Sequence, residues 1–184
     1  MTGGAVPALF SLLFAVLNGI PDTLCVIGAA ALHEAGHLLA CLLLHVPIRS
    51  FHPAPGGARI CYDPCAVSYP AEALIAAAGP AAGLLGAAAC IPGVCGRQRA
   101  LFGMCSLSLS LFNLLPVRGL DGGVLLAALA EWRGGCGAGE RALRAASPVC
   151  TVLLWMCAAA VQLRTGGNLS LFLVSVYLLT ALAL

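Results

Sequence analysis

The residues of this chain best suited to chemistry stand close together, as His33-Glu34-Ala35-Gly36-His37 inside an apolar stretch. Side chains four residues apart share one face of an α-helix, so a helix here would bring both imidazoles to one point. Two imidazoles at this spacing suit a single Zn²⁺, and Glu34 would lie beside that face, within reach of a water on the metal. Because ionisable side chains are costly in apolar surroundings, such a group marks a functional site.

A second group of polar residues, Asn113, Arg118 and Asp121, interrupts another apolar stretch. A catalytic zinc usually has three protein ligands and an open position for water, so the two histidines leave one ligand to be found. Asp121 is the best candidate among the few acids inside apolar sequence, and the glycines at 122 and 123 would let other backbone approach closely. Asp121 could also cap a helix that resumes after the interruption, and the two roles are compatible.

The elements that must position these residues belong to an integral membrane protein. Of 184 residues, 61% are hydrophobic and only 9% are charged, whereas about 25% are charged in soluble domains. The length fits one domain, 1–184, too short to be divided further. A net charge of +2, with arginine as the only basic residue besides histidine and with no basic run, argues against nucleic-acid binding.

The apolar stretches predict an all-α protein with about six transmembrane helices, since each span needs about 20 apolar residues. Asp22 is placed to cap the second helix, and Pro80 is expected to kink the third. The uneven arginine distribution puts both termini in the cytoplasm of a multi-pass cell-membrane protein. The first apolar run lacks a basic start, so we interpret it as a span rather than a cleaved signal. The expected helices cover residues 5–20, 23–46, 71–91, 100–115 resuming at 121–132, 147–163 and 168–184, with a polar loop over 134–147.

Residues 47–69 differ in kind from the rest of the chain. The stretches 48–52 and 58–62 alternate loosely around a turn rich in proline and glycine, which predicts a short β-hairpin associated with the membrane surface. An exposed edge of this hairpin could pair with an extended substrate; a plain surface loop is the alternative. His52 is either a surface residue or part of the chemistry, and His45 fits an interfacial position.

Most of the ten cysteines lie in apolar runs, where a thiol behaves as a small hydrophobic group. Cys61 and Cys65 lie outside the expected helices, so they could pair, bind a metal or remain free thiols.

The two polar motifs together resemble the site-2 protease family of intramembrane zinc metalloproteases. The resemblance rests on His-Glu-Ala-Gly-His at 33–37 and Phe-Asn-Leu-Leu-Pro-Val-Arg-Gly-Leu-Asp-Gly at 112–122, on different expected helices. The compact layout is most similar to the bacterial branch typified by stage IV sporulation protein FB. The resemblance implies zinc held by His33, His37 and Asp121, Glu34 as catalytic acid and base, and Asn113 holding substrate backbone. Asn113 could instead form a hydrogen bond between helices.

Two stretches depart from the family pattern. Residues 79–83 look like the family's Gly-Pro-x-x-Asn segment, but glycine stands where asparagine is usual. Arg118 occupies a stretch that is often apolar or contains proline. No nucleotide-sensing or PDZ domain is found within these 184 residues.

The expected function is therefore that of a zinc metalloendopeptidase acting in regulated intramembrane proteolysis. Its partners would be the lipid bilayer, single-pass or signal-like membrane protein substrates, and regulatory membrane proteins. A membrane zinc transporter would also need buried histidine and aspartate, although usually at several stations along a path, and Glu34 has no clear role in it. A catalytically inactive scaffold is the other alternative, but it would be expected to have lost one of the four site residues.

Overall fold

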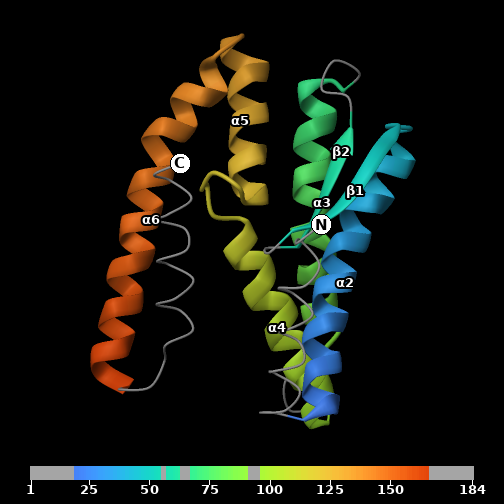
Figure 1. Cartoon of the computed structure of the whole chain (residues 1–184), viewed down its shortest axis with the longest axis vertical. Coiled ribbons are helices and arrows are strands. Elements are labelled where there is room, and N and C mark those ends of the chain that lie inside the picture. Colours follow the sequence, from blue (N-terminus) through green and yellow to red (C-terminus); the bar gives the residue numbers. More distant parts are fainter. Residues whose placement is uncertain (1–18, 55–56, 63–66, 91–95, 166–184) are drawn as a thin grey trace. The chain divides into compact units, whose positions relative to one another are not determined.

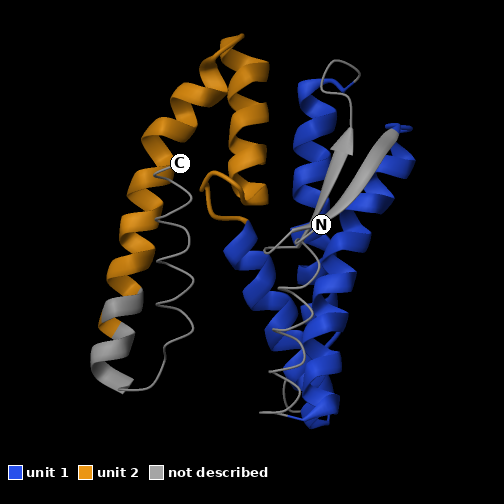
Figure 2. Cartoon of the chain, in the orientation of Figure 1, with its two compact units in different colours: residues 1–113 blue, residues 114–184 orange. Residues whose placement is uncertain are grey.

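The structure is a computed structural model that describes residues 19–54, 57–62, 67–90 and 96–165. In these ranges the elements follow the order α2, β1, β2, α3, α4, α5, α6 (Figure 1). The chain divides into two compact units, residues 1–113 and residues 114–184 (Figure 2). The helices expected at 5–20 and 168–184 lie outside the described residues, so the number of six transmembrane helices stays a prediction, as does the single domain.

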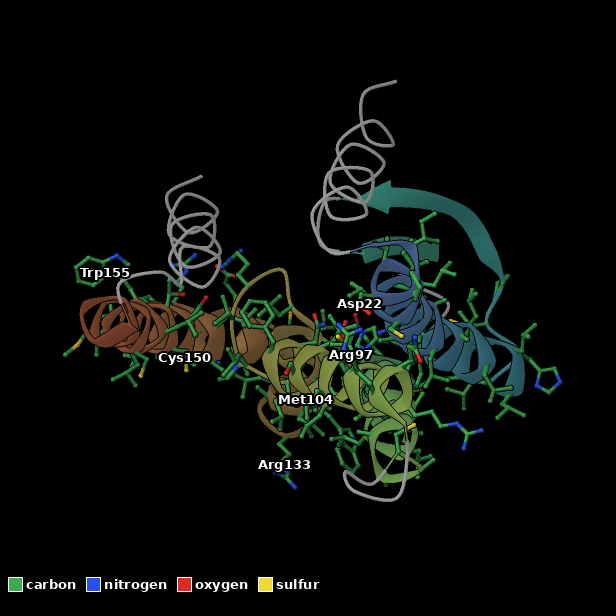
Figure 3. The ribbon with its side chains drawn as sticks, turned by 90° about the horizontal axis from the view of Figure 1, so that it is seen from below. Asp22, Arg97, Met104, Arg133, Cys150 and Trp155 are labelled. Carbon is green, nitrogen blue, oxygen red and sulfur yellow. The ribbon has the colours of Figure 1, made fainter. Side chains whose placement is uncertain are left out.

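Helix α2, Ile20–Leu43, carries both histidines of the first motif. Asp22 was expected to cap it, but the cap residue is Gly19, and Asp22 lies in the first turn of the helix. A carboxylate there is stabilised by the helix dipole. It also accepts a 2.6 Å hydrogen bond from Arg97 of another helix, so a distant partner and not a local cap fixes this side chain (Figure 3).

Helix α2 ends in a turn that reverses the backbone tightly. The amide of Val46 donates to the carbonyl of Cys41, and the amide of His45 donates to that of Leu42, the two bonds of a Schellman motif. His45 has φ 54°, in the left-handed region that glycine usually occupies at this position.

Two strands follow this turn, β1 at Ile48–Ala54 and β2 at Gly57–Tyr62. They pair as an antiparallel two-stranded sheet, with Phe51 opposite Ile60 and His52 opposite Arg59. The position of these strands at a membrane surface and any pairing with a substrate stay predictions. Cys65 lies outside the described residues.

Helices α3, Tyr69–Ala88, and α4, Arg97–Asn113, pack with α2 in the first unit. Small residues form these contacts: a β-carbon on Gly36 of α2 would lie only 2.5 Å from the carbonyl oxygen of Ala78 in α3. A β-carbon on Gly83 of α3 would likewise overlap Ser110 of α4. Such residues allow helix backbones to approach closely without a large apolar side chain between them.

Helices α2 and α3 are long and apolar enough to cross a membrane. Large apolar side chains along them are exposed, including Leu39, Leu43, Leu74 and Leu85. Helix α3 continues through Pro80, which is fully buried. The described part of the chain therefore contains two helices that are candidates for the expected spans, while the kink at Pro80 stays a prediction.

The second unit contains α5, Asp121–Gly134, and α6, Ala138–Thr165. The polar loop expected over 134–147 is therefore wrong, because α6 begins well inside it. Glu131 of α5 explains the early start: one carboxylate oxygen accepts hydrogen bonds of 3.1 and 3.2 Å from the amides of Gly137 and Gly139. A side chain from the preceding helix thus satisfies amides at the start of α6 that would otherwise lack acceptors.

Candidate functional site

The two histidines of α2 converge on one point. His33 is 4% exposed and His37 is 7% exposed, and their Nε2 atoms lie 3.2 Å apart. Two nitrogens each about 2.0–2.1 Å from one tetrahedral Zn²⁺ would be about 3.3–3.4 Å apart. The observed distance is close to this value, and zinc binding by the pair stays a prediction.

Helix α3 fixes the chemical form of one of these rings. The Nδ1 atom of His37 lies 2.7 Å from the carbonyl oxygen of Ile75. A carbonyl only accepts hydrogen bonds, so Nδ1 carries the hydrogen and donates it, which leaves the lone pair on Nε2. This is the tautomer that a metal ligand needs, and backbone carbonyls are common partners of metal-binding histidines.

Glu34 follows His33 on the same helix and is half-buried, with one carboxylate oxygen shielded from solvent. Its neighbours in the chain are a metal-ligand candidate on one side and small residues, Ala35 and Gly36, on the other. The role of Glu34 as an acceptor of a proton from water stays a prediction.

Asp121 is the first residue of α5 and is half-buried. The cap residue of α5 is Leu120, so the capping role that the sequence left open for Asp121 is not the one observed. A carboxylate in the first turn is stabilised by the helix dipole. The glycines that follow allow the expected close approach of backbone, since a β-carbon on Gly122 or Gly123 would overlap the carbonyls of the preceding interruption.

The interruption before Asp121 is held by residues of α6 that the sequence did not single out. The amide of Arg118 donates a 2.9 Å hydrogen bond to the hydroxyl of Ser147, which is 1% exposed. The guanidinium of Arg118 bonds to Glu140 at 2.8 Å, and Arg144 bonds to the same carboxylate at 3.0 Å. These hydrogen bonds from Arg118 and Arg144 lower the pKa of Glu140 from its ordinary value of 4.5.

Asn113, the last residue of α4, is 7% exposed. Its side-chain amide donates a 3.0 Å hydrogen bond to the carbonyl of Leu109, one turn earlier in the same helix. The hydrogen bond between helices that was considered for Asn113 is thus replaced by one within its own helix, and its role in binding substrate stays a prediction.

The candidate ligands lie in different compact units of the chain. His33 and His37 lie in the first unit, and Asp121 lies in the second. Each offers one ligand atom, an imidazole nitrogen or a carboxylate oxygen, and this donor set suits zinc. The set of three ligands chosen from sequence stays a prediction.

Known proteins resemble this chain in sequence over one segment and in fold over most of its length. Residues 95–157 match the family model described as peptidase family M50. The fold is similar to that of the site-2 protease from Methanocaldococcus jannaschii, with a TM-score of 0.67 and 18% identity, over 93% of this chain and 82% of that one. The chain therefore has the fold of a site-2 protease, and its segment 95–157 resembles peptidase family M50. No curated protein matches it.

The matched segment contains Asn113 and Asp121, whereas the histidine motif precedes it. Sequence reasoning missed the carbonyl of Ile75, because a backbone acceptor has no residue-type signature. The Gly79-Pro80 pair was the available signal, since an isolated glycine within a helix often marks the close approach of a neighbouring group.

Proposed function

We propose that this protein is an intramembrane zinc metalloprotease that hydrolyses peptide bonds of membrane-embedded proteins. The observation that carries the proposal is the buried pair of Nε2 atoms, 3.2 Å apart on an apolar helix, with one ring held in the ligand tautomer. Burying two imidazoles and a glutamate in a membrane-spanning helix is costly, so a structural role alone gives no account of them.

His33, His37 and Asp121 would hold the zinc ion. The ion, when bound, lowers the pKa of its water towards about 7 and polarises the scissile carbonyl. The tautomer of His37 matters for this because a hydrogen on Nε2 would exclude that nitrogen as a ligand.

Glu34 would act as the general base and then as the general acid. Its carboxylate takes one proton from the attacking water, and it later gives that proton to the nitrogen of the departing amine. The side-chain amide of Asn113 would exchange its bond to Leu109 for one to the substrate carbonyl oxygen, where negative charge develops.

The substrates would be single-pass or signal-like membrane proteins. Their helices must unwind locally, because a helical peptide bond is shielded by its own hydrogen bonds. Strands β1 and β2 supply an antiparallel ribbon in the same unit as the histidines, and an unwound segment could pair with its edge. We also propose a multi-pass protein of the cell membrane with both termini in the cytoplasm.

The experiment that tests this function compares the wild type with Glu34→Gln during co-expression with candidate single-pass substrates. We expect cleavage to be lost and zinc content of the purified protein to be retained, because the substitution removes the proton acceptor and no ligand. Glu72→Gln is the matched control: it makes the same change at a half-buried acid in the first turn of α3 and should leave cleavage intact. Identical fragments from the wild type and Glu34→Gln would refute a protease; zinc flux unaffected by Glu34→Gln would support a transporter.

The third ligand is tested by Asp121→Asn. An amide is a poor zinc ligand, so we expect zinc content to fall sharply. Asp22→Asn makes the same change at a buried acid of α2 that binds Arg97, and it should retain zinc. Equal zinc content in the two variants would exclude Asp121 as a ligand.

A further inference from the structure

Gly79 of α3 lies directly against the ring of His37. A β-carbon built on Gly79 would overlap that ring, and the three nearest atoms are all imidazole atoms, Nε2, Cε1 and Cδ2. Gly79 and the neighbouring Pro80 are both buried. The imidazole therefore fills the space that any side chain at position 79 would need.

We propose that two residues of α3 position the metal ligand His37. Gly79 leaves space for the imidazole ring, and the carbonyl of Ile75 accepts the hydrogen bond that sets the tautomer of the ring. This inference rests on the proposed zinc site. It assigns a function to the glycine of the Gly-Pro pair, and it makes α3 a part of the site although α3 supplies no ligand.

The two contacts act on different parts of the ring. The carbonyl of Ile75 holds the Nδ1 edge at 2.7 Å, and Gly79 packs against the atoms around Nε2. Together they restrict rotation of the imidazole and so direct the lone pair of Nε2 towards His33. Neither contact alone would fix both the tautomer and the direction.

The backbone of α3 cannot easily move away to admit a methyl group at position 79. Moving α3 away from α2 would open the neighbouring close contact, where Gly36 of α2 packs against the carbonyl of Ala78. The ring of His37 would therefore have to shift, and this shift would lengthen the hydrogen bond from its Nδ1 atom to the carbonyl of Ile75. Alanine at position 79 is expected to weaken metal binding without removing any ligand.

The test measures zinc affinity of the purified full chain by competition with a chelator, for the wild type, Gly79→Ala and Gly83→Ala. We expect Gly79→Ala to bind zinc about 10–100-fold more weakly, the usual cost of losing a group that orients a ligand. Gly83→Ala is the matched control on the same helix, because its methyl group would overlap Ser110 of α4 and not His37. Its affinity should stay close to that of the wild type. Absorption of bound Co²⁺ should change in Gly79→Ala and not in Gly83→Ala.

A second measurement needs no metal and covers the case in which Gly79→Ala folds poorly. The thermal midpoint is compared for Gly79→Ala in the wild type and in a His37→Ala background. If the ring causes the overlap, the methyl group should lower the midpoint with the ring present and should be neutral or stabilising with the ring removed. An equal loss in both backgrounds would overturn the inference, as would unchanged zinc affinity and Co²⁺ absorption in Gly79→Ala.

Failure of this inference is distinguishable from failure of the proposed function. Equal zinc affinity in the wild type and His33→Ala would refute the zinc site itself. Loss of affinity in His33→Ala together with full affinity in Gly79→Ala would refute only the role of α3.

Discussion

Helix α2 in the first unit and the interruption before Asp121 in the second are both fixed by their neighbours, but the contacts differ in kind. Around α2, glycines meet backbone or rings of adjacent helices, as Gly36 meets Ala78 and Gly79 meets His37. Around the interruption, Arg118 donates hydrogen bonds to two side chains of α6, Ser147 and Glu140. The first arrangement depends on the absence of a β-carbon at each glycine, and the second depends on polar side-chain atoms that accept hydrogen bonds.

This difference predicts how each region can be broken. Contacts made by close packing fail when an atom is added, and they respond little to pH or salt. Contacts made by hydrogen bonds and ion pairs fail when an atom is removed, and they depend on protonation and ionic strength.

The largest effect is expected from Gly36→Ala. The new methyl group would meet the backbone oxygen of Ala78 at 2.5 Å, and backbone cannot rotate away as a side chain can. We expect a loss of about 1–3 kcal/mol or more in unfolding free energy, the range seen for overpacked cores. Thermal unfolding in detergent measures it. Gly28→Ala is the control, since its methyl group would meet only the side chain of Phe102 at 3.5 Å; equal losses would refute the packing account.

Ser147→Ala should produce the next largest effect, in the second unit. It removes the 2.9 Å acceptor of the Arg118 amide, and an unsatisfied buried group costs about 1–3 kcal/mol. Ser106→Ala sharpens the comparison, because Ser106 of α4 is also fully buried, yet its hydroxyl has no hydrogen-bond partner among the described residues. Chemical denaturation should show destabilisation for Ser147→Ala and little or none for Ser106→Ala. The reverse order would contradict the distinction between the units.

Arg97→Gln tests the exception, a polar contact within the first unit. It removes the partner of Asp22, whose side chain is 11% exposed, while that of Arg97 is 76% exposed and well hydrated. The expected loss is about 1 kcal/mol, since solvent screens the exposed partner. Arg99→Gln, an exposed neighbour on α4, should change the thermal midpoint less. If the two variants behave alike, the pair contributes nothing to stability.

The smallest effect concerns acid sensitivity of the second unit. Arg118 and Arg144 lower the pKa of Glu140 in the folded state, so its stabilisation is present above the ordinary value of 4.5 and is lost as the pH falls through the lower folded value. Between pH 7 and about pH 3, the wild type should therefore lose slightly more thermal stability than Glu140→Gln. Parallel pH profiles for the two proteins would show that this carboxylate does not contribute.

The histidine helix could be predicted from sequence because both of its signals are local. The four-residue spacing of His33 and His37 and the surrounding apolar run are properties of one segment, and α2 covers it. The break before Asp121 was equally visible, since proline and glycine interrupt an apolar helix at a definite place.

The errors arose where a residue of another helix decides a local feature. The start of α6 is set by Glu131, and the side chain of Asp22 is held by Arg97, far along the chain. The carbonyl of Ile75 could not be foreseen as the partner of His37, because every residue has a carbonyl and only packing selects one. Local propensity is a weak guide wherever tertiary contacts supply the missing donor or acceptor.

The left-handed backbone of His45 ties the first strand to the histidine helix. Two amides of that turn bond back to α2, so the strand leaves the helix in a set direction and only a short stretch of chain beyond His37. If a substrate pairs with this strand as proposed, the helix and the turn would set its spacing from Glu34. The position of the cut would then depend on the register of the pairing more than on the side chains beside the bond.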